Sequence, residues 1–125
     1  MFYKFPYFED RPHIPVAIES KGVRKRFLPL LDSGADFSVF AKSDAILLGL
    51  DWDQGKVIVL ENADGTYFKG RTFKVKVVIQ DVVIQTDLCF SEKSNSMRLL
   101  GRKDLFKEFE ILIDEKETVV KLKKK

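Results

Sequence analysis

The sequence lacks several features that mark common classes of protein. Its 125 residues include one cysteine and one histidine. Cys89 therefore has no partner for an internal disulfide, and its apolar surroundings favour a buried side chain. His13 is the only imidazole available to a nucleophile, Ser33 lies outside any G-x-S-x-G motif, and Cys89 has no supporting motif. Serine and cysteine hydrolase sites are thus disfavoured.

Long apolar runs and targeting segments are also absent. No stretch is long enough to cross a membrane, and residues 1–6 lack the basic start and apolar core of a signal peptide. Neither a P-loop nor a dinucleotide-binding fingerprint is present. A single cysteine is compatible with a reducing compartment. We therefore expect a cytoplasmic protein with no membrane partner.

The composition that remains is typical of one globular domain, with 45% hydrophobic and 33% charged residues and a net charge of +3. Basic residues gather at 21–26 and 121–125. In the second cluster Val120 and Leu122 alternate with lysines, which predicts a strand with one solvent-exposed face. No aromatic residues are interleaved for base stacking, so we expect no nucleic-acid partner. A basic β-barrel with salt-dependent nucleic-acid binding is the weaker alternative.

Turn signals divide the chain into short segments of alternating polarity. We expect strands over 13–19, 23–31, 38–40, 56–60, 66–68, 72–79, 82–90, 97–100, 110–113 and 118–122, with a bulge or bend at Gly70. Short helices are expected over 43–48 and 103–109. Residues 1–12 are aromatic and irregular, and residues 91–96 are polar and loop-like. This series predicts a small all-β barrel or sandwich.

The first predicted helix carries its own end signals. Ser43 is a good N-cap residue, Asp44 is favourable in the first turn, and Gly49 ends the helix. Asp51 and Asp53 follow with a spacing that can bind a metal. Because no further ligands are nearby, a solvated turn is favoured over a metal site.

One stretch, from Phe27 to Phe40, is unusual. An apolar run ends abruptly in Asp32-Ser33-Gly34-Ala35-Asp36. A carboxylate at the end of an apolar strand is costly to desolvate unless it is hydrogen-bonded or paired. Gly34 permits backbone angles closed to other residues, and small Ser33 and Ala35 leave room around the acid. On this stretch alone, a polar loop between two strands fits equally well.

Two further features follow in order along the chain. A hairpin with an Asp-Gly turn is predicted over Glu61–Tyr67, and Leu99-Leu100-Gly101-Arg102 precedes the second predicted helix. Together with the Asp32 stretch, this set resembles the retropepsin-type aspartic proteases, a single-domain family that includes the retroviral proteases. The resemblance covers residues 12–122. It implies an N-terminal extension over 1–11 and a protease domain over 12–125, folded as a small closed β-barrel with one or two short helices and a flap hairpin.

The resemblance also implies a role for each matching residue. Asp32 is the catalytic aspartate, the Ser33 hydroxyl bonds across a dimer axis, and Gly34 lies where substrate backbone binds. Asp36 pairs with Arg102, which holds the loop against the final helix; if that pair is partly buried, Arg102→Ala costs on the order of 3 kcal/mol. The remaining expected site residues are Ala35 in the loop, Gly101 as structural support, and Asn62, Ala63, Asp64, Gly65 and Thr66 in the flap.

The implied mechanism needs two carboxylates at one water, with no metal or other cofactor. This chain offers a single Asp-Ser-Gly-Ala sequence and is too short for a second half-site. The expected form is therefore a homodimer with one Asp32 from each subunit, acting on a peptide or protein substrate. The polar flap tip and the C-terminal lysines depart from the retroviral pattern. A non-catalytic peptide-binding or dimerisation module on the same fold is the alternative.

Overall fold

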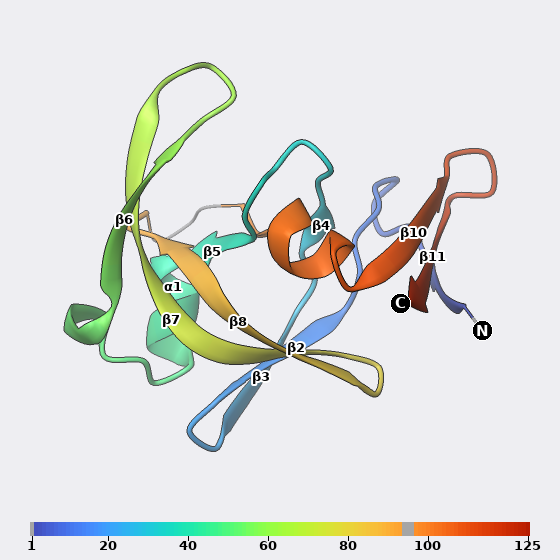
Figure 1. Ribbon diagram of the computed structural model, residues 1–125. Helices are drawn as coiled ribbons and strands as arrows, with labels where there is room; N and C mark the ends of the chain where they lie inside the picture. The colour runs from blue at the N-terminus through green and yellow to red at the C-terminus, as the bar shows by residue number, and fades with distance from the viewer. Residues whose placement is uncertain (1, 94–96) are drawn as a thin grey trace.

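The computed structural model describes residues 2–93 and 97–125, and the chain is built mainly from strands (Figure 1). Residues 94–96, part of the predicted polar loop, lie outside the described residues. The elements in order are β1 (Tyr3–Pro6), β2 (Val16–Ser20), β3 (Val23–Phe27), β4 (Leu30–Leu31), β5 (Val39–Ala41), α1 (Lys42–Leu47), η1 (Trp52–Gln54), β6 (Lys56–Glu61), β7 (Tyr67–Ile79), β8 (Val82–Ser91), β9 (Leu99–Leu100), η2 (Arg102–Phe106), β10 (Phe109–Asp114) and β11 (Val119–Lys124). The predicted all-β class is confirmed.

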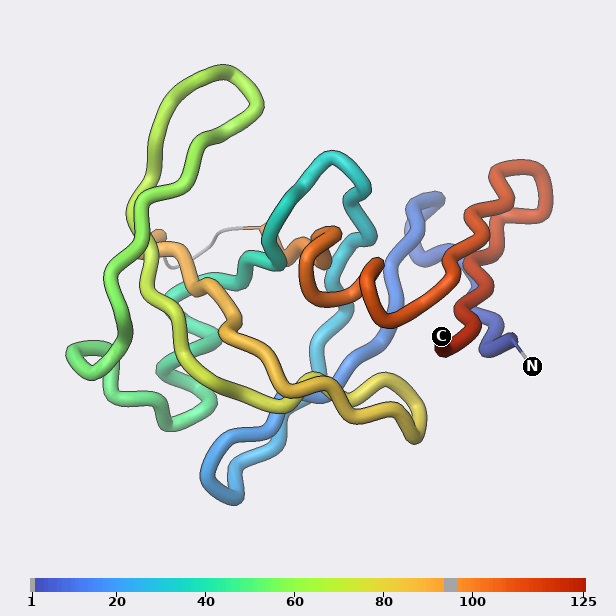
Figure 2. Tube along the Cα trace, in the orientation of Figure 1, coloured from blue at the N-terminus to red at the C-terminus, as the bar shows by residue number. Residues whose placement is uncertain are grey.

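The strands form two sheets. The larger sheet has the order β3-β2-β7-β8-β5-β9-β4 and curls on itself, and a smaller sheet has the order β1-β11-β10 (Figure 2). Within the part of the chain that the structure describes, strand β6 pairs with β7 alone. Because β7 continues into the body while β6 has no second neighbour, the β6–β7 hairpin projects from the sheet.

The core lies inside the curl of the larger sheet and is closed by the smaller sheet and α1. Phe40, Phe90 and Phe109 are its largest buried side chains, and Phe27 meets Phe40 edge to face with ring centroids 5.3 Å apart. Alternate residues of β7 and β11 point into this core, as their period of two predicts. Cys89 is 2% exposed, which confirms its predicted burial.

The N-terminal residues differ from the sequence prediction. Residues 3–6, expected to be irregular, form β1, which pairs antiparallel with β11 from Tyr3↔Leu122 to Pro6↔Val119. Phe5 is 4% exposed and belongs to the core. The strand was missed because its partner lies more than a hundred residues away and gives no local signal. The boundary at residue 12 stays a prediction.

The strand predicted over 23–31 is interrupted at Leu28–Pro29, giving β3 and β4. Proline has no backbone N–H to donate to a ladder, so pairing with β2 stops at Phe27. After the break, β4 pairs in parallel with β9 instead. This change of partner brings the residue after β4 beside β9.

A bulge or a bend was expected at Gly70, and the structure has no bulge there. The register with both neighbours is continuous there, with Ile58↔Gly70 on one side and Gly70↔Ser91 on the other. Glycine is instead required for space, because a Cβ at this position would lie 2.6 Å from the carbonyl oxygen of Phe90.

Both predicted helices are shifted. Helix α1 begins after Ala41 rather than Ser43. Asp44 lies in its first turn, as expected, and is 2% exposed. The second is the short π-helical segment η2, and Phe109 belongs to β10 rather than to a helix. Among the described residues, no helix has the length and apolar character needed to span a membrane.

Candidate active site

Strand β4 carries Asp32 to the edge of the core. Leu30 and Leu31 are buried and pair with Leu99 and Leu100 of β9. The Asp32 N–H then donates to the carbonyl oxygen of Leu100 at 3.0 Å. Burial ends at this point, because the Asp32 side chain is only half-buried and the next two residues are exposed. The carboxylate therefore stands at the boundary between the core and the surface.

The residues after Asp32 fold into a tight turn, here called the Asp32 loop (residues 32–38). The Ala35 N–H donates to the Asp32 carbonyl at 3.1 Å, and the Gly34 N–H donates to Asp32 Oδ1 at 2.9 Å. A Cβ on residue 34 would lie 3.2 Å from that same carboxylate oxygen. Gly34 thus allows the backbone to approach the carboxylate and to satisfy one of its oxygens with a hydrogen bond, as a partly buried polar group requires.

The segment from β9 into η2 docks against this loop. The Arg102 N–H donates to the Ala35 carbonyl and the Lys103 N–H to the Asp36 carbonyl, both at 2.9 Å. Gly101 packs so closely that a Cβ would lie 2.5 Å from the carbonyl carbon and oxygen of Phe37. The structure thus brings Gly101 and Arg102, which were expected as structural support, against the Asp32 loop.

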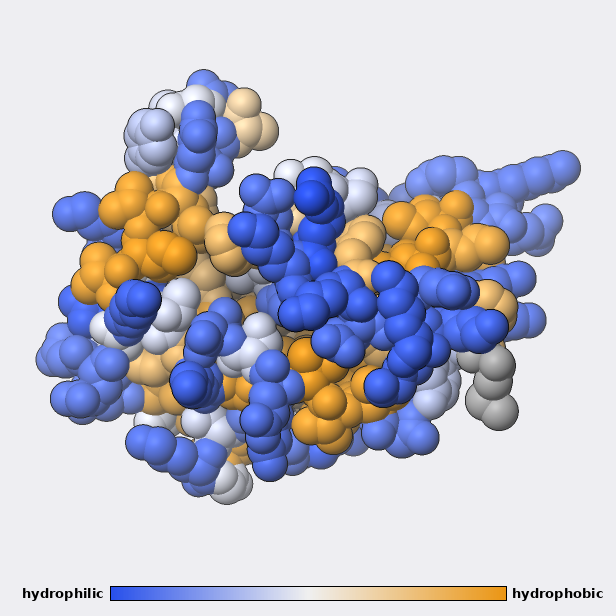
Figure 3. Space-filling view, viewed as in Figure 1, coloured by the Kyte–Doolittle hydropathy of each residue, from blue (hydrophilic) through white to orange (hydrophobic). Residues whose placement is uncertain are grey.

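The β6–β7 hairpin has a tip of five exposed residues that bond among themselves. Asn62 Nδ2 donates to Thr66 Oγ1 at 3.0 Å, and the Thr66 hydroxyl donates to Asp64 Oδ1 at 2.6 Å. These bonds from the Thr66 hydroxyl and N–H lower the pKa of Asp64. Gly65 has φ +86°, and Ala63 completes the turn. Figure 3 shows a notch between this tip and the Asp32 loop.

The whole arrangement resembles solved structures. It is similar to a retropepsin-like aspartic protease from Rickettsia conorii, with a TM-score of 0.70, 21% sequence identity and 98% of each chain covered. It is also similar to EIAV protease complexed with an inhibitor, with a TM-score of 0.55, 23% identity, and 78% of this chain and 88% of that chain covered. This chain has the retropepsin fold. No protein-family profile and no curated protein matches the sequence.

The expected pair between Asp36 and Arg102 is weaker than a partly buried pair. Their closest atoms, Oδ1 and Nη1, are 3.7 Å apart, and the side chains are 59% and 58% exposed. Ion pairs this open to water contribute about 0–1 kcal/mol. The condition for a cost near 3 kcal/mol is therefore not met, and the Asp32 loop is held by other contacts.

One such contact, missed by the sequence reasoning, joins Ser38 and Asp104. Ser38 is 2% exposed, and its Oγ donates to Asp104 Oδ1 at 2.5 Å while accepting from the Gly101 N–H at 2.9 Å. Asp104 Oδ1 also accepts from the Leu105 N–H at 3.0 Å. Burial raises the pKa of Asp104, and its hydrogen bonds from Ser38 and Leu105 oppose that rise. The two residues are 66 positions apart, so no local pattern signals the pair.

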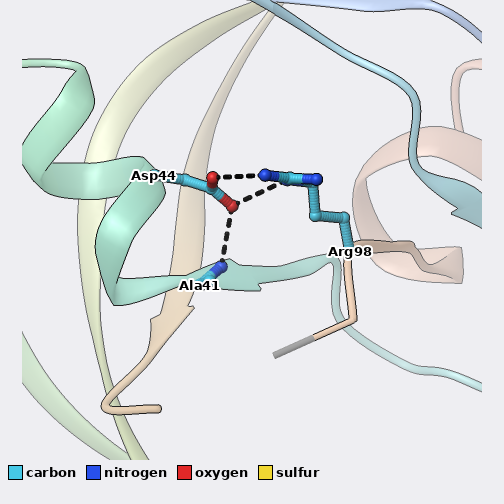
Figure 4. Close-up of polar contacts among 3 residues, drawn as sticks. All are labelled: Ala41, Asp44 and Arg98. Atoms are coloured by element: carbon cyan, nitrogen blue, oxygen red, sulfur yellow. Dashed lines mark hydrogen bonds and ion pairs between the residues drawn. The ribbon is translucent and has the colours of Figure 1, made fainter. Parts of the chain in front are cut away.

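A second missed contact joins Asp44 to Arg98 (Figure 4). Arg98 Nε and Nη2 donate to the two carboxylate oxygens at 2.9 and 2.8 Å, and the Ala41 N–H donates to Asp44 Oδ2 at 3.0 Å. These bonds to Asp44 raise the pKa of Arg98. The Arg98 carbonyl accepts from the Leu30 N–H at 3.0 Å. The pair therefore ties α1 to the residue that enters β9.

Other predicted or possible sites do not gather around Asp32. Within residues 2–93 and 97–125, no group of three or more His, Cys, Asp and Glu side chains lies close enough to hold a metal ion. Asp51 instead accepts a hydrogen bond from the Asp53 N–H at 3.2 Å and starts η1. A cavity of about 660 Å³ lies between the β2–β3 turn and the middle of β7 and β8, and none of its lining residues is a predicted site residue.

Proposed function

We propose that this protein is an aspartic endopeptidase of the retropepsin family that acts as a homodimer, with one Asp32 from each subunit. The observation that carries the proposal is the placement of Asp32, half-buried at the end of β4 on a tight loop. That loop is hydrogen-bonded to the Gly101–Lys103 segment. The retropepsin fold supports the same conclusion, because the two solved structures reported above are described as proteases.

The chemistry follows from bringing two such carboxylates to one water. Two carboxyl groups that contact the same water are too close for both to ionise, so the pair shares one proton and titrates as a unit. The ionised carboxylate acts as general base on the water. The protonated one donates to the peptide carbonyl and stabilises the developing oxyanion. The single chain has one Asp32 loop, so the site is complete only in a dimer.

The exposed neighbours of Asp32 fit the remaining roles. Ser33 and Gly34 are exposed in the single chain, and are therefore available to a second subunit and to substrate backbone respectively. The hairpin tip from Asn62 to Thr66 is proposed to close over a bound peptide. Its distance from the loop, visible as the notch in Figure 3, leaves room for substrate to enter.

Replacing Asp32 tests the proposal. Wild-type protein and Asp32→Asn are incubated with a mixed peptide library between pH 3 and pH 7, and products are identified by mass spectrometry. We expect Asp32→Asn to lose at least about 10³-fold in rate, because it removes a general base, with an unchanged melting temperature. The matched control is Asp51→Asn, which keeps an N-cap side chain on an exposed turn and should cleave normally. Cleavage that survives in Asp32→Asn would refute the assignment.

The alternative is a non-catalytic peptide-binding or dimerisation module. The observation favouring it is the polar hairpin tip, whose hydrogen bonds are made within the hairpin itself. Under this alternative, library peptides bind to wild-type protein and to Asp32→Asn with equal affinity and remain intact. Isothermal titration with the same library pools, followed by mass spectrometry, separates the two candidates.

A further inference from the structure

We propose that Ser38 and Asp104 are positioning residues that fix the Asp32 loop in its catalytic geometry. This inference rests on the proposed function, because the geometry matters to a reaction only if Asp32 takes part in one. It concerns two residues that the family resemblance did not indicate. The loop and the β9–η2 segment meet along their length through backbone hydrogen bonds, and the buried Ser38 and the part-buried Asp104 supply a side-chain contact between them.

Ser38 belongs to the Asp32 loop and makes hydrogen bonds to the β9–η2 segment, so it contacts both segments at once. Its hydroxyl accepts from the Gly101 N–H and donates to Asp104 Oδ1, so one buried atom joins the end of the loop to two points of the docking segment. Gly101 directly follows Leu100, whose carbonyl accepts from the Asp32 N–H. A shift of Gly101 therefore moves the acceptor that orients Asp32 itself.

Asp104 completes the arrangement by accepting twice at the same oxygen. Oδ1 receives the Ser38 hydroxyl at 2.5 Å and the Leu105 N–H at 3.0 Å. Buried donors that lose their acceptor are costly, whereas an acceptor of the same shape can replace the original one. An amide in place of the carboxylate keeps that oxygen, and a leucine removes it while retaining similar volume.

The exposed pair Asp36–Arg102 lies next to the Ser38–Asp104 pair in the sequence but differs from it in burial. Ser38 lies two residues beyond Asp36, and Asp104 lies two residues beyond Arg102, so both pairs join the same two segments. The first pair is separated by 3.7 Å with both side chains more than half exposed, whereas Ser38 is 2% exposed. Since exposed ion pairs contribute little and satisfied hydrogen-bond networks away from water rigidify their surroundings, the side-chain part of the restraint on the loop lies with Ser38 and Asp104, in addition to the backbone hydrogen bonds.

The test uses four variants of the full chain: Asp104→Leu, Asp104→Asn, Ser38→Ala and the control Arg102→Ala. The kcat and KM of each are measured on one peptide that the wild type cleaves, together with a pH profile of kcat/KM and a melting curve. We expect Asp104→Leu and Ser38→Ala to lose at least about tenfold in kcat with KM within about threefold, because misplacing a reacting group chiefly slows the chemical step. Both limbs of their pH profile should move, since the Asp32 pair is displaced. Asp104→Asn should recover at least about half of the wild-type kcat, and Arg102→Ala should behave as wild type.

Two results on active proteins would overturn the inference. One is a folded Asp104→Leu or Ser38→Ala protein with wild-type kcat and pH profile, and the other is Asp104→Asn failing to recover activity although it melts as wild type. A wild-type protein that cleaves no peptide is a failure of the proposed function instead. Hydrogen–deuterium exchange of residues 32–38 is then decisive, because exchange that is no faster in Asp104→Leu than in Arg102→Ala shows that the pair does not restrain the loop. A variant that does not fold is replaced by Ser38→Thr, which keeps the hydroxyl. This protein should retain activity, and its residues 32–38 should exchange as slowly as those of the wild type.

Discussion

The Asp32 loop and the β6–β7 hairpin lie on the same side of the molecule but are held in opposite ways (Figure 1). The loop donates a hydrogen bond to Leu100 of β9 and accepts others from Arg102 and Lys103 of η2, far along the sequence. It packs against Gly101 without room for a methyl group. The hairpin tip bonds to itself, and all five of its residues are exposed. The proposed reacting group is thus anchored by distant residues, while the tip of the segment proposed to cover the substrate is anchored within its own hairpin.

The difference has a physical origin in strand pairing. Strand β4 is two residues long, yet it lies beside β9 and is followed by a docked loop. Strands β6 and β7 form a six-residue ladder, yet β6 has no other neighbour. Opening free energies in proteins are lowest where few buried contacts anchor a segment. We therefore expect the loop to resist change and the hairpin to tolerate it.

The largest effect is expected from Gly101→Ala. Its Cβ would meet backbone atoms of Phe37 at 2.5 Å and the Ala35 carbonyl oxygen at 2.9 Å, and backbone cannot move aside as a flexible side chain does. We expect a loss of about 3 kcal/mol in the free energy of unfolding, measured by urea denaturation. The matched substitution in the hairpin is Gly65→Ala, where nothing lies within 4 Å of the new Cβ and φ is +86°. Its cost is the left-handed conformation alone, about 1 kcal/mol; equal losses at both sites would contradict the contrast.

Arg98→Ala is expected to have the next largest effect. Among the residues that the structure describes, it leaves the carboxylate of Asp44, which is 2% exposed, with the Ala41 N–H as its remaining hydrogen-bond partner. Stranding a buried charge costs about 3–5 kcal/mol, and because Arg98 is itself 44% exposed in its side chain, water admitted at the site reduces this to about 2 kcal/mol. Asp44→Asn with Arg98→Ala removes the stranded charge and should recover part of the loss. An Arg98→Ala protein as stable as the wild type would show that the pair does not secure the entry to β9.

Asp64 in the hairpin tip and Asp104 beside the Asp32 loop should have pKa values shifted in opposite directions from the ordinary value. The pKa of Asp64 is lowered by bonds from Thr66, so the order it gives the tip is present above its ordinary value of 3.8 and is lost as pH falls through the lowered pKa. The pKa of Asp104 is raised by burial, so its ionisation opposes folding, and stability declines as pH rises from 3.8 through the raised pKa. Carboxyl carbon shifts followed by NMR should place the Asp64 midpoint below that of Asp104. The reverse order would contradict the assignment of their surroundings.

Local patterns in the sequence were sufficient for the features that one segment defines. The Asp-Gly turn predicted the hairpin over residues 61–67, and the apolar run before Asp32 predicted a strand that ends at the acid. The alternation of Val120 and Leu122 with lysines predicted β11. Each of these depends on neighbours in the chain, and each strand or turn is present in the structure.

Features that depend on distant partners were not predictable in this way. Strand β1 pairs with the far end of the chain, and Asp44 is a buried ion-pair residue only because Arg98 approaches it. The same holds for Ser38 with Asp104, whereas the resemblance directed attention to Asp36 and Arg102, which are exposed. The break between β3 and β4 was also missed, although its cause is local. Pro29 lacks a backbone N–H, and this can be read directly from the sequence.

The claim that the site is shared between two chains is tested most directly by its stoichiometry. A statine-containing peptide, which mimics the hydrated peptide bond, is titrated calorimetrically into protein whose mass is followed by sedimentation equilibrium at the same concentrations. The account predicts one peptide bound for every two chains, a dimer mass in the bound state, and no binding to Asp32→Asn. One peptide bound per chain by a protein that remains a monomer would contradict it.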